Sequence, residues 1–400
     1  MKDMSVFAGK NIVVGVSGSI AAFKTATWVS DLAKEESLVH VVMSQAAEKF
    51  ITPLTYGALS GNPVHTEMFQ KGQYHSMAHI DLGREADIVI IAPASANTIA
   101  KLAGGFADNL LTTTVLATTA PVMVFPAMNS KMYSNKVTQE NIRKLEGLGF
   151  LVVNPDSGMM ACKEEGQGRL PEWEVAKEHI AKAMSEKDLL GKHFLVTAGP
   201  TRESIDPARY LSNRSSGKMG YALARCAWRR GAQVTLVSGP TSLLDPVGVQ
   251  CVHVNSARQM YDAVMSHYSN SDVVIKAAAV ADYRPEVQSE HKVKKNHIDL
   301  TMGLAQNPDI LFELGQNKRD GMLLVGFAAE SQRLKEEGRK KIEKKNLDLI
   351  AVNDISKKNS GFESDTNKVL LIDSVGEEQL PLTTKDATAN LILNKIVSLF

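Results

Sequence analysis

Residues able to bind a phosphate follow an apolar run near the middle of the chain. The stretch "RSSGKMG" (214–220) places a Gly-Lys pair at the start of a helical pattern, behind a run that ends "VTAGPTRE". An ATPase loop has the form G-x-x-x-x-G-K-[ST], but Ser212 stands at its first glycine and Met219 follows the lysine. The pattern therefore excludes an ATPase loop. Its small residues and helix start still suit a phosphorylated ligand, and the role of Lys218 stays open.

Two loops of small residues in the first half follow apolar runs in the same way. "GVSGSIAAFK" (15–24) is not G-x-G-x-x-G, and the second run ends in a serine where a dinucleotide site has an acidic residue. The pattern favours a mononucleotide such as FMN, with a tight turn as an equal alternative. "APASANTIAK" (92–101) forms the second loop, whose polar residues could also be helix caps only. The candidate FMN-binding residues are Gly15, Ser17, Gly18, Ser19, Ser44, Ser95, Asn97 and Thr98.

Three further residues of the first half could take part in catalysis. They are His79 in "MAHIDLG", Asn129 in "FPAMNSKMY" and Cys162 in the glycine-rich loop "PDSGMMACKEEGQGRL". Each has a structural alternative, because single histidines and cysteines are mostly structural and asparagine often holds a turn. The other cysteines, Cys226 and Cys251, are expected in the core. Three scattered cysteines do not make a disulfide framework, so we expect a reducing cytoplasm.

Lysines dominate the polar segments of the second half. "KEEGRKKIEKKN" (335–346) places Lys341 and Lys345 on one helix face, and Lys292 lies in the hydrophilic stretch 284–300, which we expect to be a mobile loop. Such lysines are usually solvated, but converging lysines can bind a triphosphate. "NPDIL" (307–311) is typical of a helix start with proline in the first turn.

Alternating apolar runs and helical patterns predict the fold. The predicted strands of the first half lie near 11–17, 38–44, 86–95, 121–128 and 150–156, with helical segments near 19–34, 97–119 and 136–148. The pattern restarts at 191–200 and continues near 233–239, 250–255, 272–279, 322–328, 348–353 and 368–373. Such alternation predicts parallel sheets covered by helices on both faces. We therefore predict two three-layer α/β domains, 1–188 and 189–400, flavodoxin-like or Rossmann-like, separated in the polar stretch 183–192.

The overall charge and hydropathy limit the classes of partner. The formal net charge of +1 provides no global attraction to nucleic acid or an anionic membrane. No stretch of about 18 uninterrupted apolar residues occurs, so no membrane span is expected. Small molecules are the expected partners.

The motifs, taken in order, resemble a known enzyme family. "SGSIAA", "HIDLG", "PASANTIAK", "PAMN" and the late cysteine loop are similar to flavin-dependent cysteine decarboxylases. "TAGPTRE", "SSGKMG", "AAAVADYRP", "NPDIL", "GFAAE" and "KKNLDLIAVND" extend the resemblance. Together they resemble the bifunctional bacterial proteins of coenzyme A synthesis, in which phosphopantothenate–cysteine ligase is fused to phosphopantothenoylcysteine decarboxylase. The resemblance runs from about residue 9 to about residue 355.

For the first half, the resemblance implies decarboxylation with FMN as the electron sink. FMN oxidises the substrate thiol, the carboxylate then leaves as CO2, and the hydride returns. His79 would assist proton removal or thiol oxidation, Asn129 would hold the carboxylate, and Cys162 would donate the final proton. The family's flap commonly continues from the cysteine as Gly-Asp. Lys163 and Glu165 mark the departure from that pattern here.

For the second half, the resemblance implies CTP-dependent joining of 4′-phosphopantothenate to cysteine through an acyl-cytidylate. Lys292 would stabilise charge during activation, and Asn213 would hold the acyl-cytidylate. Mg2+ is implied by the triphosphate, with no ligand spacing of its own in the sequence. The implied CTP-binding residues are Ala277, Ala278, Asp282, Lys292, Asn307, Pro308, Asp309, Ile310, Phe327, Lys341 and Lys345.

Two alternatives remain open at the level of sequence. One is a decarboxylase with an inactive ligase half, and the other is a flavin-binding subunit that inhibits a phosphatase, because such subunits share the decarboxylase fold. The presence of all the matched catalytic positions argues against the first, and the intact Cys162 loop and the complete second half argue against the second. The resemblance also implies flavin-domain trimers joined through ligase-domain dimers into a dodecamer.

Overall fold

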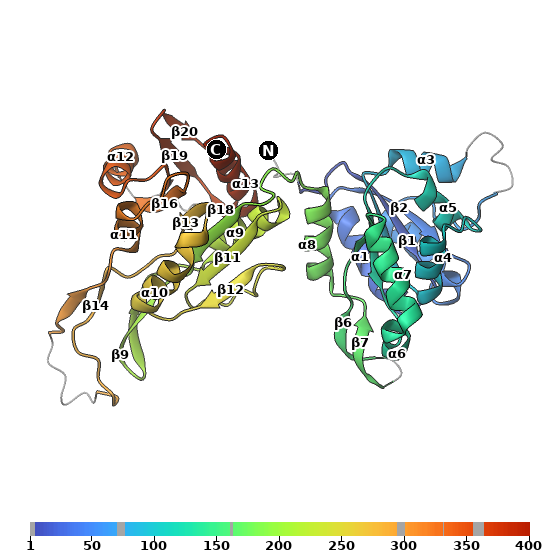
Figure 1. Ribbon diagram of the computed structural model, residues 1–400, viewed down its shortest axis with the longest axis horizontal. Helices are drawn as coiled ribbons and strands as arrows, with labels where there is room; N and C mark the ends of the chain where they lie inside the picture. The colour runs from blue at the N-terminus through green and yellow to red at the C-terminus, as the bar shows by residue number, and fades with distance from the viewer. Residues whose placement is uncertain (1–4, 70–76, 161–162, 294–300, 331, 355–363) are drawn as a thin grey trace. The chain divides into compact units, whose positions relative to one another are not determined.

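The protein is described by a computed structural model, which covers residues 5–69, 77–160, 163–293, 301–330, 332–354 and 364–400. The chain divides into two compact units, Lys2–Ser185 and Glu186–Phe400. Each unit is built around its own β-sheet (Figure 1). Both units have the expected three-layer α/β architecture.

The first unit contains a five-stranded parallel sheet of order β2-β1-β3-β4-β5. Its strands are β1 (Asn11–Val16), β2 (Leu38–Met43), β3 (Ile88–Ala94), β4 (Val122–Pro126) and β5 (Leu151–Val152). They lie where the apolar runs predicted them. The exception is the run 150–156, of which two residues pair in the sheet. Pro155 has no N–H to continue the ladder, and the chain turns into the hairpin β6 (Asp156–Met159) and β7 (Glu165–Arg169).

Helices cover both faces of this sheet. Apolar residues of α1 (Ala22–Lys34), α2 (Pro53–Ser60) and α8 (Trp173–Met184) pack on one face. The other face is covered by α3 (Ala78–Glu85), α4 (Ala96–Gly104), α5 (Leu110–Ala117) and α7 (Lys136–Gly147). The predicted helical segment 97–119 is thus two helices, because Gly105 ends α4 in the left-handed region with φ of 71°. The turn η1 (Ala47–Lys49) follows β2.

The β6–β7 hairpin lies beside α6 (Ser130–Ser134) in the first unit (Figure 1). The backbone N–H of Met128 donates to the Gly168 carbonyl at 3.0 Å. A Cβ on Gly168 would lie 2.1 Å from the Met128 carbonyl oxygen, so only glycine permits this approach. The hairpin is therefore fixed at its base to the loop that carries Asn129.

The second unit contains an eight-stranded sheet of order β12-β11-β8-β13-β16-β17-β19-β20. The first six strands in this order are parallel, and β19 and β20 pair antiparallel to their neighbours. The strands are β8 (His193–Ala198), β11 (Gln233–Ser238), β12 (Gln250–His253), β13 (Val273–Lys276), β16 (Leu323–Glu330), β17 (Leu349–Asp354), β19 (Val369–Asp373) and β20 (Glu377–Gln379). This order is that of a Rossmann sheet with two added strands.

Helices again form the outer layers. Buried residues of α9 (Lys218–Arg229) and α13 (Lys385–Val397) pack on one face. The other face is covered by α10 (Ala257–His267), α11 (Ile310–Gln316) and α12 (Leu334–Lys345), with η2 (Tyr268–Asn270) after α10. A short ladder joins β18 (Thr366–Asn367) to β21 (Thr383–Thr384) before α13. Cys226 is buried in α9, and Cys251 in β12 is half-buried against the core.

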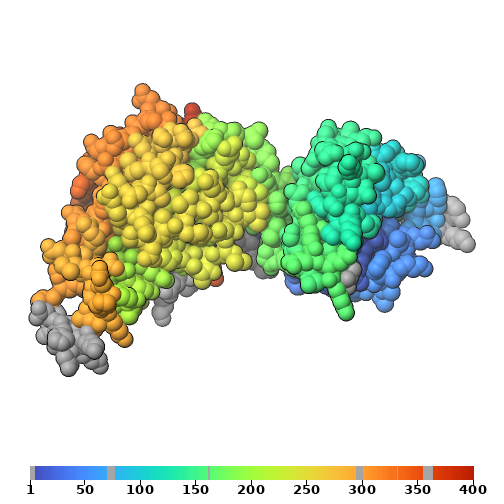
Figure 2. Space-filling model, turned by 60° about the horizontal axis from the view of Figure 1, so that its bottom comes forward, coloured from blue at the N-terminus to red at the C-terminus, as the bar shows by residue number. Residues whose placement is uncertain are grey.

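Two antiparallel ribbons extend from the second sheet. They are β9 (Arg202–Asp206) with β10 (Arg209–Ser212), and β14 (Tyr283–Pro285) with β15 (Leu304–Gln306). Figure 2 shows the β14–β15 segment, drawn in orange, projecting from the body of this unit. The N–H of Ser289 donates to the Ile205 carbonyl, and the N–H of Val293 donates to the Asp206 carboxylate. In its described part, 284–293, the predicted loop follows β14 as an irregular segment and is hydrogen-bonded to β9 at two points.

In the part of the chain that the structure describes, no helix is long and apolar enough to cross a membrane.

Candidate active sites

The loops after β1 and β3 meet at the carboxyl edge of the first sheet. The chain runs from β1 outward to β2 and returns to β3 on the other side, so the sheet order reverses at this point. In sheets of this order FMN binds at the corresponding crevice. The Ser17 hydroxyl donates to the Pro93 carbonyl at 2.6 Å and accepts from the Ser95 N–H at 2.8 Å. Ser17 is completely buried, so its hydroxyl holds the two loops together rather than facing a ligand directly.

The glycines of the first loop are required by packing. A Cβ on Gly15 would lie 2.8 Å from Cδ1 of Ile91, and one on Gly18 would lie 2.6 Å from Cβ of Ala46. Both distances are shorter than packed carbon atoms allow. Gly18 thus brings the start of α1 against the loop that follows β2, where Ser44 is half-buried and accepts from the Ala47 N–H at 3.3 Å.

The start of α4 provides the polar part of this crevice. Ser95 caps the helix by accepting from the Thr98 N–H at 3.3 Å, and Thr98 is buried. Asn97 is exposed and has no hydrogen-bond partner among the described residues. Ser19 is half-buried, and its hydroxyl lies 3.4 Å from the N–H of Ala21. Helix N-termini with short polar residues suit a phosphate, so this edge fits the phosphate of a flavin mononucleotide.

His79 is the second residue of α3, and it is half-buried. Its Nδ1 atom is buried and has no hydrogen-bond partner among the described residues. A buried ring nitrogen without a partner is costly, which indicates a ligand or another group that completes the site. The geometry thus favours a functional role for His79 over a purely structural one.

Asn129 caps α6 and also contacts the hairpin. Its Oδ1 accepts from the Lys131 N–H at 2.9 Å, and its Nδ2 donates to Oε2 of Glu164 at 2.9 Å. The bond from Asn129 holds the pKa of the Glu164 carboxyl below its usual range, and the charge of Lys131 acts in the same direction. Sequence analysis missed Glu164, although an acidic residue two positions after the candidate cysteine was a signal. Cys162 itself lies outside the described residues.

Lys163 takes the position where the related flap has glycine. Its φ is 63°, in the left-handed region that glycine adopts without cost. Its N–H donates to the Met160 carbonyl, and the Met160 N–H donates to the Glu164 carbonyl, both at 2.9 Å. Glu165, the other noted departure, begins β7 and is exposed.

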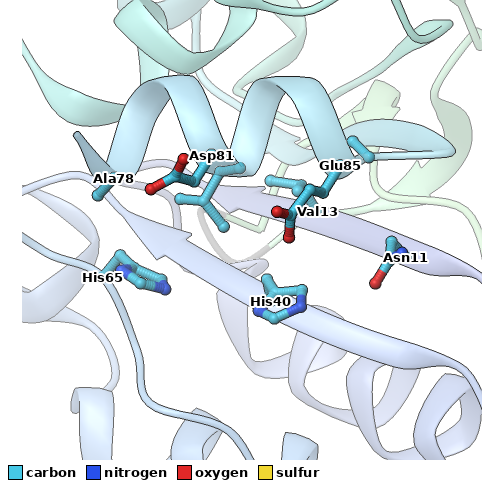
Figure 3. A pocket seen from close by; sticks show the side chains of 9 residues that line it. Asn11, Val13, His40, His65, Ala78, Asp81 and Glu85 are labelled. Carbon is cyan, nitrogen blue, oxygen red and sulfur yellow. The ribbon is translucent and has the colours of Figure 1, made fainter. Parts of the chain in front are cut away.

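Figure 3 shows a pocket of about 220 Å3 between α3 and the strands below it, which the sequence did not indicate. Asp81 and Glu85 of α3 line it from above, and His40 of β2 and His65 from below. Burial, and secondarily the charge of His40, lower the pKa of His65. Among the described residues no group of three or more His, Cys, Asp or Glu side chains is arranged to hold a metal ion.

In the second unit the sheet order reverses between β8 and β13. The loops after these strands are joined there by side chains. Thr197 Oγ1 accepts from the Ala278 N–H at 3.1 Å, and Thr201 Oγ1 accepts from the Ala281 N–H at 3.0 Å. Asn213 is exposed, and its Nδ2 donates to the carbonyls of Ala279 and Val280 at 3.1 and 3.2 Å. The structure thus brings Asn213 together with the alanine segment after β13.

A cavity of about 130 Å3 opens beside this junction. It brings the "SSGKMG" stretch together with Ala277, Ala278 and Phe327. Sequence analysis had placed these last three residues, but not the stretch itself, in the nucleotide site. Gly217 caps α9 in the left-handed region with φ of 77°. The cavity is also lined by residues that sequence analysis missed, namely Asn353, Asn367 and Lys385.

The remaining candidate nucleotide residues lie around the start of α11. The buried Asn307 donates its N–H to the Asp282 carbonyl and its Nδ2 to the Ala281 carbonyl, each at 2.8 Å. Lys345 pairs with Asp309 at 2.9 Å. Asp309 is the cap of α11, ahead of Ile310, so Pro308 precedes the helix and the expected proline in its first turn is wrong.

The lysines predicted to bind the nucleotide differ in their surroundings. Lys341 pairs with Glu330 at 2.6 Å, so like Lys345 it has an acidic partner. Lys292 is exposed and makes no hydrogen bond or ion pair with a described residue. Phe327 is half-buried at the cavity. Lys341 and Lys345 therefore lie on α12, whereas Lys292 lies on the segment that is hydrogen-bonded to β9.

Lys276, which sequence analysis did not single out, is buried at the end of β13. Its Nζ lies 3.8 Å from Sδ of Met260. Burial lowers the pKa of Lys276 to about 7, with Asp309 opposing this shift and Lys345 adding to it. A lysine inside the apolar run "VVIKAAAV" was the available signal.

Comparison with known proteins covers the whole chain. The flavoprotein family model matches residues 5–185, and the model of the DNA/pantothenate metabolism flavoprotein C-terminal domain matches residues 189–399. The coenzyme A biosynthesis bifunctional protein CoaBC of Vibrio vulnificus is 46% identical, with 99% of each chain covered. The chain belongs to the CoaBC family. The proteins of that name from Bacillus subtilis and Escherichia coli are each 45% identical, with 98% of this chain and 97% of theirs covered.

As a member of this family, the chain is a bifunctional enzyme of coenzyme A biosynthesis. Its flavoprotein domain is the phosphopantothenoylcysteine decarboxylase, and its second domain is the phosphopantothenate–cysteine ligase. The full-length match does not favour a regulatory flavoprotein or an inactive ligase half.

Proposed function

We propose that residues 1–188 decarboxylate 4′-phosphopantothenoylcysteine with FMN, and that residues 189–400 make this substrate from 4′-phosphopantothenate, cysteine and CTP. The observation that carries the first part is the Ser17 bridge between the loops after β1 and β3, because it builds the crevice where such sheets hold FMN. The second part is supported by the bonds from Asn213 to the segment after β13.

In the first unit, FMN when bound supplies reversible oxidation of the substrate thiol, which allows the carboxylate to leave as CO2. His79, whose buried Nδ1 has no partner among the described residues, accepts a proton as the thiol is oxidised. Asn129 holds the substrate carboxylate through its Nδ2. Cys162 donates a proton in the last step. The FMN-binding set comprises Gly15, Ser17, Gly18, Ser19, Ser44, Ser95, Asn97 and Thr98, in which Gly15, Ser17 and Gly18 shape the crevice.

In the second unit, the carboxylate of 4′-phosphopantothenate attacks the α-phosphorus of CTP and pyrophosphate leaves. The cysteine amine then attacks the acyl carbon and CMP leaves. Lys292 stabilises the charge that develops in the first step, and Asn213 holds the acyl-cytidylate. The nucleotide is bound by Ala277, Ala278, Asp282, the turn 307–310, Phe327, Lys341 and Lys345. Mg2+ is held mainly through the CTP phosphates, since no acidic cluster is present among the described residues.

We further propose a cytoplasmic dodecamer built from trimers of the first unit and dimers of the second. Analytical ultracentrifugation of the full chain tests this assembly, and a monodisperse species smaller than a dodecamer would contradict it.

Flavin binding tests the first half of the proposal. The purified protein is expected to be yellow with flavin absorbance, and protein that stays colourless after FMN is added would contradict it. Cys162→Ser should lower the rate of complete decarboxylation by about 100-fold or more. It should leave the ligase activity unchanged. Cys251→Ser is the matched control, because Cys251 lies in the second unit outside both sites. Equal loss of both activities in Cys162→Ser would indicate misfolding instead.

Pyrophosphate release tests the second half. With CTP, cysteine and 4′-phosphopantothenate, the protein should release pyrophosphate and form an amide. Asn213→Asp should strongly reduce the rate of amide formation and leave the decarboxylase active. The control Asn270→Asp, at an exposed position of η2, should change neither activity. Unimpaired amide formation in Asn213→Asp would remove this residue from the site.

A further inference from the structure

The side-chain amide of Asn129 already binds a carboxylate that belongs to the protein itself. Its Oδ1 accepts from the Lys131 N–H at 2.9 Å, which sets the orientation of the amide and turns Nδ2 to the other side. There Nδ2 donates to Oε2 of Glu164 at 2.9 Å. Under the proposed function, the same Nδ2 holds the carboxylate of the substrate. Glu164 therefore occupies the donor that a substrate carboxylate needs.

The β6–β7 hairpin positions Glu164 beside Asn129 (Figure 1). A Cβ on Gly166 would lie 2.8 Å from Cβ of Ser130, so the hairpin packs directly on the start of α6. Towards the other end of the hairpin, the Met160 N–H donates to the Glu164 carbonyl at 2.9 Å. The backbone of Glu164 is thus held in place by the fold, and its contact with Asn129 is more than a chance pairing of surface side chains.

The side chain of Glu164 is an anion that is free to turn away. The bond from Asn129, and secondarily the charge of Lys131, hold the pKa of the Glu164 carboxyl below its usual range, so the group is ionised near neutral pH. Lys131 Nζ lies 3.4 Å from Oε1 of Glu164, but the Lys131 side chain is 83% exposed, and such pairs contribute little. Glu164 is itself 43% exposed. Solvent beside it can therefore receive the carboxylate when another one binds Asn129.

Two carboxylates do not share one amide, because their charges repel each other at that distance. We propose that Glu164 is an internal competitor for the carboxylate site of the decarboxylase. It bonds to Asn129 in the substrate-free enzyme and is displaced by the carboxylate of 4′-phosphopantothenoylcysteine. This inference rests on the proposed function, in which Asn129 holds that carboxylate. Loss of CO2 removes the substrate carboxylate, so Glu164 returns to Asn129 once the product has formed.

Steady-state kinetics of the FMN-loaded, full-length protein test the competition. An internal competitor lowers the apparent affinity by the fraction of sites that it leaves open. Because a hydrogen bond to a charged group is a strong one, Glu164→Ala should lower KM for 4′-phosphopantothenoylcysteine about tenfold or more. Glu164→Gln should lower KM less, since its side-chain oxygen still accepts from Asn129. Glu165→Ala is the matched control, because it removes the same charge at the next residue, which is exposed and begins β7.

The product of the reaction separates competition from a structural role. 4′-Phosphopantetheine has no carboxylate to compete with Glu164, so its calorimetric affinity should be the same in wild type and in Glu164→Ala. A disturbed hairpin would instead change the binding of substrate and product alike. The proposal would be overturned by a KM that rises, or stays within twofold of wild type, in Glu164→Ala. An equal change in 4′-phosphopantetheine binding would overturn it as well.

A double-mutant cycle assigns the effect to Asn129. Asn129→Ser keeps a side chain that can cap α6 but is too short to reach Glu164. In this background Glu164→Ala should no longer strengthen substrate binding, measured by calorimetry on FMN-loaded protein. An undiminished gain would mean that Glu164 repels the substrate without occupying Asn129, which contradicts the proposal. If wild-type protein releases no CO2 from 4′-phosphopantothenoylcysteine, the proposed function fails, while calorimetry with substrate and product still tests the competition.

Discussion

The two units begin with the same strand–turn–helix arrangement, but they reach the helix differently. In the first unit the chain passes from β1 to α1 through a short turn, in which Gly18 packs against Ala46. In the second unit the β9–β10 ribbon is inserted between β8 and α9, and Gly217 starts the helix beside a cavity. The short turn serves to pack loops around one cofactor. The inserted ribbon instead ends at Ser212, directly before Asn213, whose Nδ2 donates to the carbonyls of Ala279 and Val280.

The largest expected effects come from filling a close approach beside α1 in the first unit and beside α9 in the second. Gly18→Val and Gly220→Val each place carbon atoms where Ala46 and Ala198 already lie, at 2.6 Å from the first added atom. Displacing a site by about 1 Å can lower activity about 100-fold. We expect Gly18→Val to lose flavin and decarboxylation but keep the ligase, and Gly220→Val to do the reverse.

Flavin absorbance and pyrophosphate release, measured on the same preparation, check this pair. Gly147→Val and Gly376→Val are controls, because no atom lies within 4 Å of a Cβ at either position. Loss of both activities in either tight variant would mean that the units do not function separately.

A second prediction concerns Lys276, a lysine buried in a strand of the second sheet. No lysine was named among the buried strand residues of the first unit. The Lys276 pKa of about 7 means that the unfolded state binds more protons than the folded state between pH 7 and the ordinary lysine pKa. Stability therefore rises with pH across that window. Lys276→Met should raise the free energy of unfolding of the second unit at pH 7 by on the order of 3 kcal/mol.

Denaturant unfolding at pH 7 and pH 9.5 measures this effect. The gain from Lys276→Met should shrink at the higher pH, and the transition of the first unit should not move. Lys335→Met serves as the surface control. A gain that does not depend on pH would mean that better packing, rather than loss of the charge, stabilises the variant.

A third, smaller effect is expected at residues with left-handed backbone. Lys163 has φ of 63° in the hairpin of the first unit, and Asn346 has φ of 51° at the end of α12. Lys163→Gly should stabilise the hairpin by about 0.5–1 kcal/mol. Asn346→Gly should not stabilise, because asparagine tolerates this conformation and its Nδ2 donates to the Gly315 carbonyl at 3.1 Å.

Amide hydrogen exchange of β6 and β7 reports the change in the hairpin. Slower exchange in Lys163→Gly is the expected result. Unchanged or faster exchange would show that the left-handed position carries no strain.

The smallest effect is a pH dependence confined to the first unit. The lowered pKa of His65 means that the unfolded state binds more protons as pH falls through the ordinary histidine range. The first unit should therefore lose stability as the pH falls from 7 to 5. His65→Gln should flatten that part of the stability profile, whereas His253→Gln, at an exposed position in the second unit, should not.

Much of the fold and part of the site could be predicted from the sequence. Continuous β-branched runs mark buried parallel strands, so β1, β3, β8 and β16 were expected close to their observed positions. The predicted strand over 150–156 was too long, because hydrophobicity alone does not show that strand pairing stops before Pro155. The hydrogen bond from the loop at Val293 to Asp206 could not be predicted, because Asp206 lies far away in the sequence.

Sequence by itself determined the order of the motifs, the two-unit organisation and the residue types available for flavin and nucleotide chemistry. Only the tertiary structure decided which of these residues meet. Ser17 became a bridge, Glu164 reached Asn129, and Lys218 shared a cavity with Lys385 and Asn367. The physical reason is that spacing along a strand or helix specifies a face, whereas contacts between elements depend on how the sheet order reverses and which loops converge at its carboxyl edge.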